Sequence, residues 1–343
     1  MDPAEGRTQG QSCHLLQQRG DHSRNMRRSR LRQSRSMSGA LRCLAWTFVA
    51  ILGILTFLGF FDRFTPYLEL ATVFRPHYVV ALALAAVGAA LLRLFRVALA
   101  GLILAGVNLA VIAPGGAAFE TPAFNAPRLR LLLINVDYQN HEYTRVARLI
   151  AETDPDVVGI TELTPAWTSG LRPTLERFPT RMLETQDGAF GIGLFSSVPF
   201  ATASVERFPP QGPPSIVATA VVGGERVGLV LTHVHTPFAG RIHTRQLEAL
   251  GEARANWEHR LVMCGDFNAV PWSHSFRSLE SAAGLESIHD GFGFGGTWPA
   301  GVPVLRLALD NCLLSDDLVL EARRVGPNVG SDHLPLIVEL RIA

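Results

Sequence analysis

The chain has 343 residues, of which 48% are hydrophobic and 18% are charged, enough for one large domain and an additional segment. Its 31 basic residues are all Arg and are unevenly distributed. Residues 1–42 hold nine Arg and three acidic residues, whereas residues 128–343 hold 18 Arg and 24 acidic residues. The net negative charge of the C-terminal part weighs against a protein that binds nucleic acid by neutralising many phosphates.

Residues 1–40 are polar and rich in Ser and Arg, which predicts a disordered segment on the cytoplasmic side of a membrane. An alternative interpretation is an upstream extension, with translation starting at Met26 or Met37. A cleaved signal peptide is disfavoured because several further apolar runs follow.

Residues 41–114 are almost continuously apolar and predict three transmembrane helices. The apolar runs are Leu41–Phe61, Tyr78–Leu92 and Val97–Ala113, and Tyr67–Phe74 could extend the second. The alternative is a signal anchor followed by two buried core helices. Arg-rich segments stay cytoplasmic, which predicts a cytoplasmic position for the Arg-rich start and for the Arg93–Arg96 loop. The chain is therefore expected to be a multi-pass protein of the cell (inner) membrane, with a C-terminal domain that is periplasmic or otherwise extracytoplasmic.

After a linker at residues 115–128, residues 129–343 alternate strand-like and helix-like patterns. We expect strands at 129–135, 157–161, 191–196, 216–222, 227–233, 261–264, 307–314 and 336–341, and helices at 143–152, 166–178 and 244–258. Few helices among many buried strands favour an α/β (α+β) domain of two packed sheets with helices outside. A Rossmann fold is disfavoured because no GxGxxG follows a strand and opens a helix.

The four cysteines show no CxxC pair and no zinc spacing. Cys264 and Cys312 lie in apolar strand-like runs, and we interpret them as small buried hydrophobic residues. A disulfide between them is the alternative if the domain lies outside the cytoplasm.

Polar residues stand at the ends of several expected strands. They are Asn135, Asp137, Glu162, Asp266, Asn268, Asp310, Asp332 and His333. Carboxylates are almost never buried unpaired, so several of them at one edge of a sheet stack require a cation or a shared proton. Oxygen ligands without a Cys cluster favour Mg²⁺ or Mn²⁺ over structural zinc.

The ordered segments NVD (135–137), TE (161–162), HVHTP (233–237), GDFN (265–268), LD (309–310) and SDH (331–333) resemble the endonuclease/exonuclease/phosphatase, or DNase I-like, superfamily. The resemblance covers residues 129–343. It implies a two-sheet β-sandwich flanked by helices, with a metal-dependent phosphoesterase site at one end of the sheets.

The resemblance also implies roles for individual residues. The metal ligands would be Asn135, Asp137, Glu162 and Asp332, with Mg²⁺ or Mn²⁺ as the ion. Asp266 would orient or deprotonate water, and Asn268 would hold a phosphate oxygen. His333, oriented by Asp310, would stabilise developing charge, while His235 would act on the leaving group. Strand alternation favours a His233 side chain that points into the core. Trp298 lies in a loop that either shapes the substrate site or caps the core.

With three N-terminal spans, the chain is most similar to the membrane-anchored, vancomycin/teicoplanin-resistance-associated subgroup of this superfamily. The implied partners are the lipid bilayer and a phosphoester substrate, which could be lipid-linked, at the outer face of a bacterial membrane. A membrane-tethered nuclease is the alternative, with nucleic acid the less favoured substrate. A non-catalytic envelope binding protein is a third hypothesis. The sequence leaves the oligomeric state open.

Overall fold

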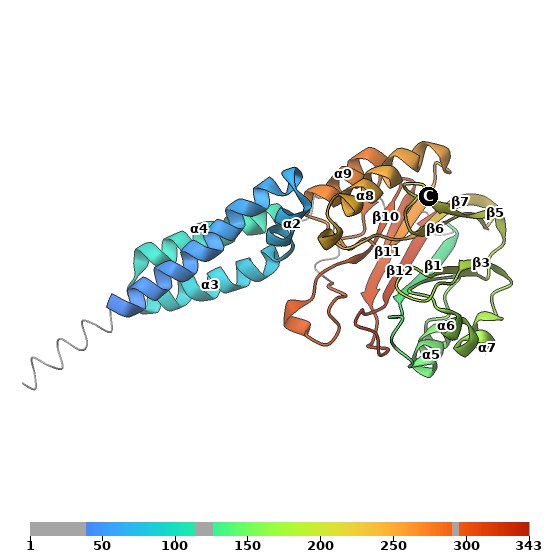
Figure 1. Ribbon diagram of the computed structural model, residues 1–343, viewed down its shortest axis with the longest axis horizontal. Coiled ribbons are helices and arrows are strands. Elements are labelled where there is room, and N and C mark those ends of the chain that lie inside the picture. Colours follow the sequence, from blue (N-terminus) through green and yellow to red (C-terminus); the bar gives the residue numbers. More distant parts are fainter. Residues whose placement is uncertain (1–38, 114–125, 290–294, 343) are drawn as a thin grey trace, which may run out of the picture. The chain divides into compact units, whose positions relative to one another are not determined.

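The structure, a computed structural model, describes residues 39–113, 126–289 and 295–342 (Figure 1). The expected disordered segment, apart from residues 39 and 40, and most of the expected linker lie outside these residues. The described chain divides into two compact units. The first contains residues up to Ile54 and Val80–Ala105, and the second contains Leu55–Val79 and Gly106–Ala343.

The apolar N-terminal region is helical throughout its described part. An N-terminal helix, Gly39–Phe64, ends in the 3₁₀ turn η1 (Gly59–Phe64) and is followed by α2 (Pro66–Val73), α3 (Arg75–Leu91) and α4 (Phe95–Ile112). The N-terminal helix and α4 are each long and apolar enough to cross a membrane, and α2 with α3 would make a third span bent by 44°. The bend falls just before Pro76, which lacks an N–H and crowds the preceding turn.

Two six-stranded sheets form the core of the second unit. The first sheet has the order β11-β12-β1-β2-β4-β3 and the second β5-β6-β7-β8-β10-β9. The strands are β1 (Arg128–Asn135), β2 (Val157–Thr161), β3 (Thr180–Glu184), β4 (Ile192–Ser196), β5 (Phe200–Arg207), β6 (Pro214–Val222), β7 (Glu225–His233), β8 (Leu261–Asp266), β9 (Glu286–Ser287), β10 (Asp310–Leu314), β11 (Leu318–Val325) and β12 (Leu336–Ile342). The pairs β1·β2 and β7·β8 are parallel, and the other pairs are antiparallel.

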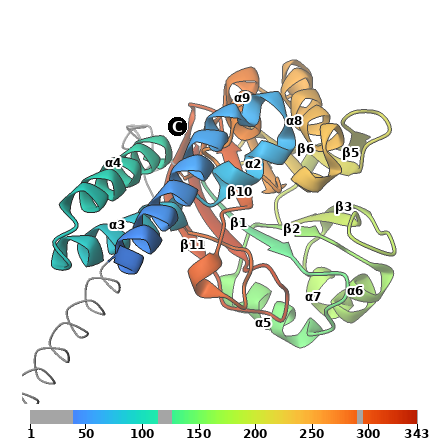
Figure 2. The ribbon, with the colours of Figure 1, turned by 60° about the vertical axis from the view of Figure 1, so that its left-hand side comes forward.

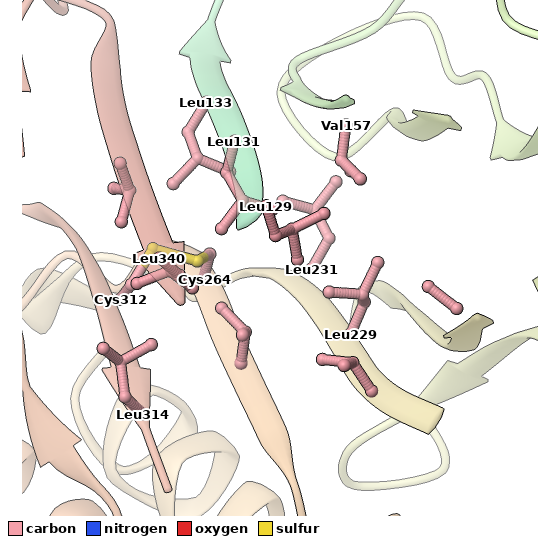
Figure 3. Packing of buried hydrophobic residues seen from close by; sticks show 14 of the residues in the cluster. Leu129, Leu131, Leu133, Val157, Leu229, Leu231, Cys264, Cys312, Leu314 and Leu340 are labelled. Atoms are coloured by element: carbon pink, nitrogen blue, oxygen red, sulfur yellow. A yellow bond between two sulfur atoms is a disulfide. The ribbon is translucent and has the colours of Figure 1, made fainter. Parts of the chain in front are cut away.

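The hydrophobic core follows the two-residue period of the strands. Leu129, Leu131 and Leu133 of β1 face the second sheet, where they share a buried cluster with Leu229 and Leu231 of β7 (Figure 3). The intervening side chains of β1 belong instead to a cluster with the outer helices. Both faces of the central strands are therefore buried, which explains why these strands are apolar without interruption.

Helices cover the outer faces of both sheets (Figure 2). On the first sheet lie α5 (Tyr143–Thr153), α6 (Pro165–Gly170) and α7 (Arg172–Leu175), which bury Val146, Trp167 and Leu175. On the second sheet lie α8 (Arg241–Ala253) and α9 (His274–Ala283), which bury Leu250 and Phe276. This architecture confirms the predicted two-sheet sandwich flanked by helices.

Several expected elements differ in detail. The helix expected at 166–178 is divided at Leu171, next to Pro173, and α8 begins at Arg241 rather than at residue 244. The strand expected at 307–314 begins at Asp310. The sequence patterns did not indicate β3, β5, β9, β11, α9 and the short 3₁₀ turns η2 (Pro237–Ala239), η3 (Arg254–Asn256) and η4 (Pro303–Leu305).

The interpretation of Cys264 and Cys312 as separate thiols is wrong, because the structure joins them in a disulfide (Figure 3). The two residues are directly opposite each other in the antiparallel β8·β10 pair, with their Cα atoms 4.1 Å apart. Both are buried in the cluster between the sheets, as expected for small hydrophobic side chains. The pairing depends on a cross-strand register that cysteine spacing does not reveal.

Candidate active site

Strands from both sheets end at a common edge of the sandwich. Asn135 ends β1, Thr161 ends the parallel neighbour β2, and Asp266 ends β8. Asp310 begins β10 but pairs directly with Asp266, because β10 runs antiparallel to β8. The polar residues expected to form one site are thus brought together by strand order and register.

Three of these residues have a left-handed backbone, which is unusual outside glycine. The φ angles are 57° at Asp137, 61° at Glu162 and 48° at Asn268. Such conformations cost about 1–3 kcal/mol each and persist where the surroundings impose them, often at functional sites. Gly265 has a φ of 151°, and a Cβ there would overlap the Thr232 carbonyl, so the GDFN segment requires glycine at its first position.

Asn135 joins carboxylates of the two sheets. Its Nδ2 donates to Glu162 Oε1 at 3.0 Å and to Asp266 Oδ2 at 3.2 Å, and its Oδ1 accepts from the Asp137 N–H at 3.0 Å. Glu162 Oε2 accepts from the Tyr138 N–H at 3.0 Å. Burial raises the pKa of the Glu162 carboxyl despite the opposing effect of a nearby histidine. The two sheets therefore hold a pair of acidic groups close together at low solvent exposure.

His333 and Asp310 form the second part of the site. His333 Nδ1 lies 2.8 Å from Asp310 Oδ2, and His333 Nε2 lies 3.5 Å from Asp266 Oδ2. Burial alone would lower the pKa of the imidazole, but the carboxylates of Asp310 and Asp266 outweigh it and raise that pKa to about 10. Ser331 Oγ positions this segment by donating to the Asn135 carbonyl and accepting from the His333 N–H. The structure thus brings a positively charged imidazole to the acidic pair.

The His233 side chain is buried on the core-facing side of β7, as strand alternation predicts, because it shares that face with Leu229 and Leu231, but this side also borders the site. Its Nε2 lies 3.6 Å from Asp266 Oδ2, because His233 pairs with Asp266 in the parallel β7·β8 register and shares its face of the sheet. His233 Nδ1 donates to the Ala189 carbonyl. His235 also lines the cavity, but its Nδ1 donates to Gln246 Oε1. The strand register was the missing signal.

The remaining expected residues occupy different positions around the site. Asn268 donates its N–H to Asp266 Oδ1 and its side-chain amide to the Val234 carbonyl. Asp332 is exposed and accepts from the Trp298 indole N–H at 2.9 Å, and Trp298 both lines the cavity and packs against a buried hydrophobic cluster. Asp137 lies beside the Asn135–Glu162 pair, and its carboxylate accepts from the Gln139 N–H. Gln246, which sequence reasoning missed, bridges the backbone of His233 and His235.

A cavity of about 430 Å³ lies over these groups. Its polar lining comprises Glu162, His233, His235, Asp266, Asn268, Asp332 and His333. The volume falls within the range of small-molecule sites, about 300–1,000 Å³. These seven side chains therefore border the same cavity.

The donor set fits a hard divalent cation. Glu162, Asp137 and Asp332 offer carboxylate oxygens and Asn135 an amide oxygen, which Mg²⁺ and Mn²⁺ prefer. A cation would also oppose the burial that raises the pKa of Glu162. Atoms of Asp266, Asp310 and His333 also lie within 4.8 Å of one another, as in metal-binding groups. In this group, His333 Nδ1 is already engaged by Asp310.

Residues 132–333 match the model of the Endonuclease/Exonuclease/phosphatase family. A search of curated proteins finds no match. Among solved structures, the chain is similar to D. rerio TDP2 complexed with a single-strand DNA product, with 20% identity and a TM-score of 0.54 over 62% of this chain and 99% of that one. It is also similar to the human Nocturnin catalytic domain with a bound sulfate anion (19% identity, TM-score 0.53, 64% and 96% coverage). A Bacteroides thetaiotaomicron member of the same family gives 14% identity and a TM-score of 0.51 over 64% and 97%. At these identities the similarity is one of fold.

Proposed function

Since the chain belongs to the endonuclease/exonuclease/phosphatase family, whose members hydrolyse phosphoesters, we propose that it is a membrane-anchored phosphoesterase that requires a divalent metal, Mg²⁺ or Mn²⁺. The observation that carries the proposal is the convergence of Glu162, Asp266 and His333 at one cavity, where Asn135 bridges the two carboxylates and Asp310 holds the imidazole. These groups come from five strand ends in two sheets, so packing alone does not account for their proximity.

The proposed chemistry is attack of water on phosphorus with cleavage of one P–O ester bond. Asp266 takes a proton from the water, and Asn268 holds a phosphate oxygen. The charged His333 imidazole, kept in place by Asp310, neutralises charge on the phosphoryl oxygens. The leaving alkoxide receives a proton from an imidazole, for which the structure favours His233 over the His235 expected from the sequence, because His233 lies against Asp266.

The metal would be held by Glu162 and Asn135, with Asp137 and Asp332 close to it. When bound, it would supply positive charge to the phosphate oxygens and lower the pKa of a bound water.

We further propose that the site lies at the outer face of the membrane, on a chain with three spans. The N-terminal Arg-rich segment and the Arg93–Arg96 loop favour cytoplasmic positions for both. With the 17 residues of α3 as the middle span and α2 outside the bilayer, three spans leave α2 and the domain after α4 on the same, outer side. Contacts within the second unit agree with this topology: Trp272 Nε1 donates to the Thr72 carbonyl of α2, and Arg277 donates to the Val111 carbonyl of α4.

A phosphoester panel tests this function. The full chain in amphipol is assayed with alkyl phosphates, sphingomyelin and plasmid DNA, with Mg²⁺, Mn²⁺ or a chelator. We expect metal-dependent hydrolysis of a phosphoester other than a nucleic acid. The rate should fall at least about 100-fold in Glu162→Gln, because loss of a group that only supports a metal ligand already lowers activity about 10–100-fold. Glu252→Gln, an exposed glutamate of α8, is the matched control and should retain activity. Preferential nicking of DNA, weakened steeply by salt, would identify a nuclease instead.

A further inference from the structure

One wall of the active-site cavity is apolar and comes from the segment that connects two membrane-spanning helices. Leu70, Val73 and Phe74, in and directly after α2, line the same cavity as Glu162 and His333. All of these residues belong to the second compact unit. The catalytic cavity is thus continuous with a surface supplied by the juxtamembrane helix.

Packing and hydrogen bonding hold this apolar wall in place. Val73 is buried in a cluster with Leu307 and Leu309, which precede Asp310 and line the cavity as well. The helix α2 is held to α9 by a 2.6 Å hydrogen bond from Ser275 Oγ to Glu69 Oε1. These contacts hold α2 against the domain, so that its apolar residues border the same cavity as the carboxylates.

The apolar surface continues to the rim of the cavity. Phe238, in η2 after His235, lines the cavity while 71% of its surface is exposed. Tyr67 and Phe64, near the start of α2, are also largely exposed. Aromatic residues of this kind are typical of the membrane–water interface, where the helices on both sides of α2 would place them. Exposed aromatic side chains therefore stand both at the cavity, as Phe238, and near the start of the helix that supplies its apolar wall.

We propose that this wall binds the hydrocarbon tail of a membrane lipid phosphate, so that the enzyme hydrolyses lipid phosphoesters whose tails remain in the outer leaflet. The inference rests on the proposed phosphoesterase function and names its substrate class. The phosphate faces Asn268 and His333, and the first carbons of the tail pack against Leu70, Phe74 and Phe238. A nucleic-acid substrate would need cationic side chains along its phosphates, and the described residues that line this cavity include no Arg.

A chain-length series tests the inference in the full chain in amphipol. The substrates are monoalkyl phosphates and 4-nitrophenyl alkyl phosphates with two to eight carbons, below the concentrations at which they form micelles. Burial of one methylene is worth about 0.8 kcal/mol, so kcat/KM should rise about fourfold per carbon until the wall is covered. Leu70→Ser and Phe238→Ser should each reduce this rise, and the exposed Phe238 can be changed without disturbing the core. Val304→Ser, an exposed apolar residue of η4 outside the cavity, is the matched control and should leave the rise intact.

The results separate the two proposals. A kcat/KM that is independent of chain length, or a rise that is equal in wild type and in both wall variants, would overturn the lipid assignment while the phosphoesterase function stands. If no chain length is hydrolysed with either metal, the proposed function fails and the lipid assignment fails with it.

Discussion

Asp266 has an imidazole on each side, and the two imidazoles differ in their second partner. His333 Nδ1 faces the carboxylate of Asp310, which stabilises a charged ring. His233 Nδ1 donates to the Ala189 carbonyl, which orients the ring without adding negative charge. His333 is therefore suited to carry a positive charge beside a phosphate, and we propose His233 as the group that acts on the leaving alkoxide because its Nε2 faces Asp266.

This difference predicts how two substitutions depend on the leaving group. Protonation of an alkoxide by a general acid is worth about 10²–10⁴-fold, whereas 4-nitrophenolate leaves without it. His233→Asn should therefore lower kcat at least about 100-fold for alkyl leaving groups and less than about tenfold for 4-nitrophenolate. The matched variant His235→Asn should lower both rates to a similar extent. Steady-state kinetics on paired esters measure the effect, and a leaving-group dependence confined to His235→Asn would restore the assignment made from the sequence.

At the scale of elements, the sequence predicts those strands that are buried along their whole length. Buried strands such as Val157–Thr161 read as apolar runs, and the polar residue after each run marks the site edge. The strand β5 was missed because its side chains are half-buried or exposed and give no continuous apolar run. The proximity of His233 to Asp266 was missed because it depends on the register between β7 and β8, which are separated by a helix. The contribution of α2 to the cavity was missed because its apolar residues are equally well explained as part of a membrane span.

The contact between α2 and α9 predicts a local change in stability. Ser275→Ala removes one hydrogen bond to the buried Glu69 side chain, which keeps its interaction with Ser273, and should weaken the docking of α2 by about 0.5–1.5 kcal/mol, the net contribution of one hydrogen bond. Hydrogen exchange of the α2 amides should become faster, while exchange in β1 and β2 stays unchanged. Ser278→Ala, exposed on the same helix, is the control. Equal exchange of α2 in the two variants would contradict a docked α2.

At the scale of the whole molecule, the proposed membrane topology and the disulfide in the core both require a catalytic domain outside the cytoplasm. The Cys264–Cys312 disulfide crosses two neighbouring strands of the second sheet inside the buried core. Disulfides form and persist outside the cytoplasm, so the pairing agrees with the proposed outer location of the domain. The disulfide also stabilises the fold. It joins residues 48 positions apart, and in the chain-entropy model the lost entropy of the unfolded chain is worth about 4 kcal/mol.

Counting the free thiols of the full chain tests whether the catalytic domain lies outside the cytoplasm. If the domain is exported, denaturation in an alkylating reagent without reductant should modify two of the four cysteines, Cys13 and Cys43, as counted by mass spectrometry. Cys264→Ala should raise the number to three by releasing Cys312, and it should lower the free energy of unfolding of the domain by about 2–5 kcal/mol. Cys43→Ala should reduce the number to one and leave the unfolding of the domain unchanged, because Cys43 is exposed in the N-terminal helix. Four modified cysteines in the wild-type chain would show that Cys264 and Cys312 are reduced. The domain would then lie in a reducing compartment, which contradicts the proposed outer location.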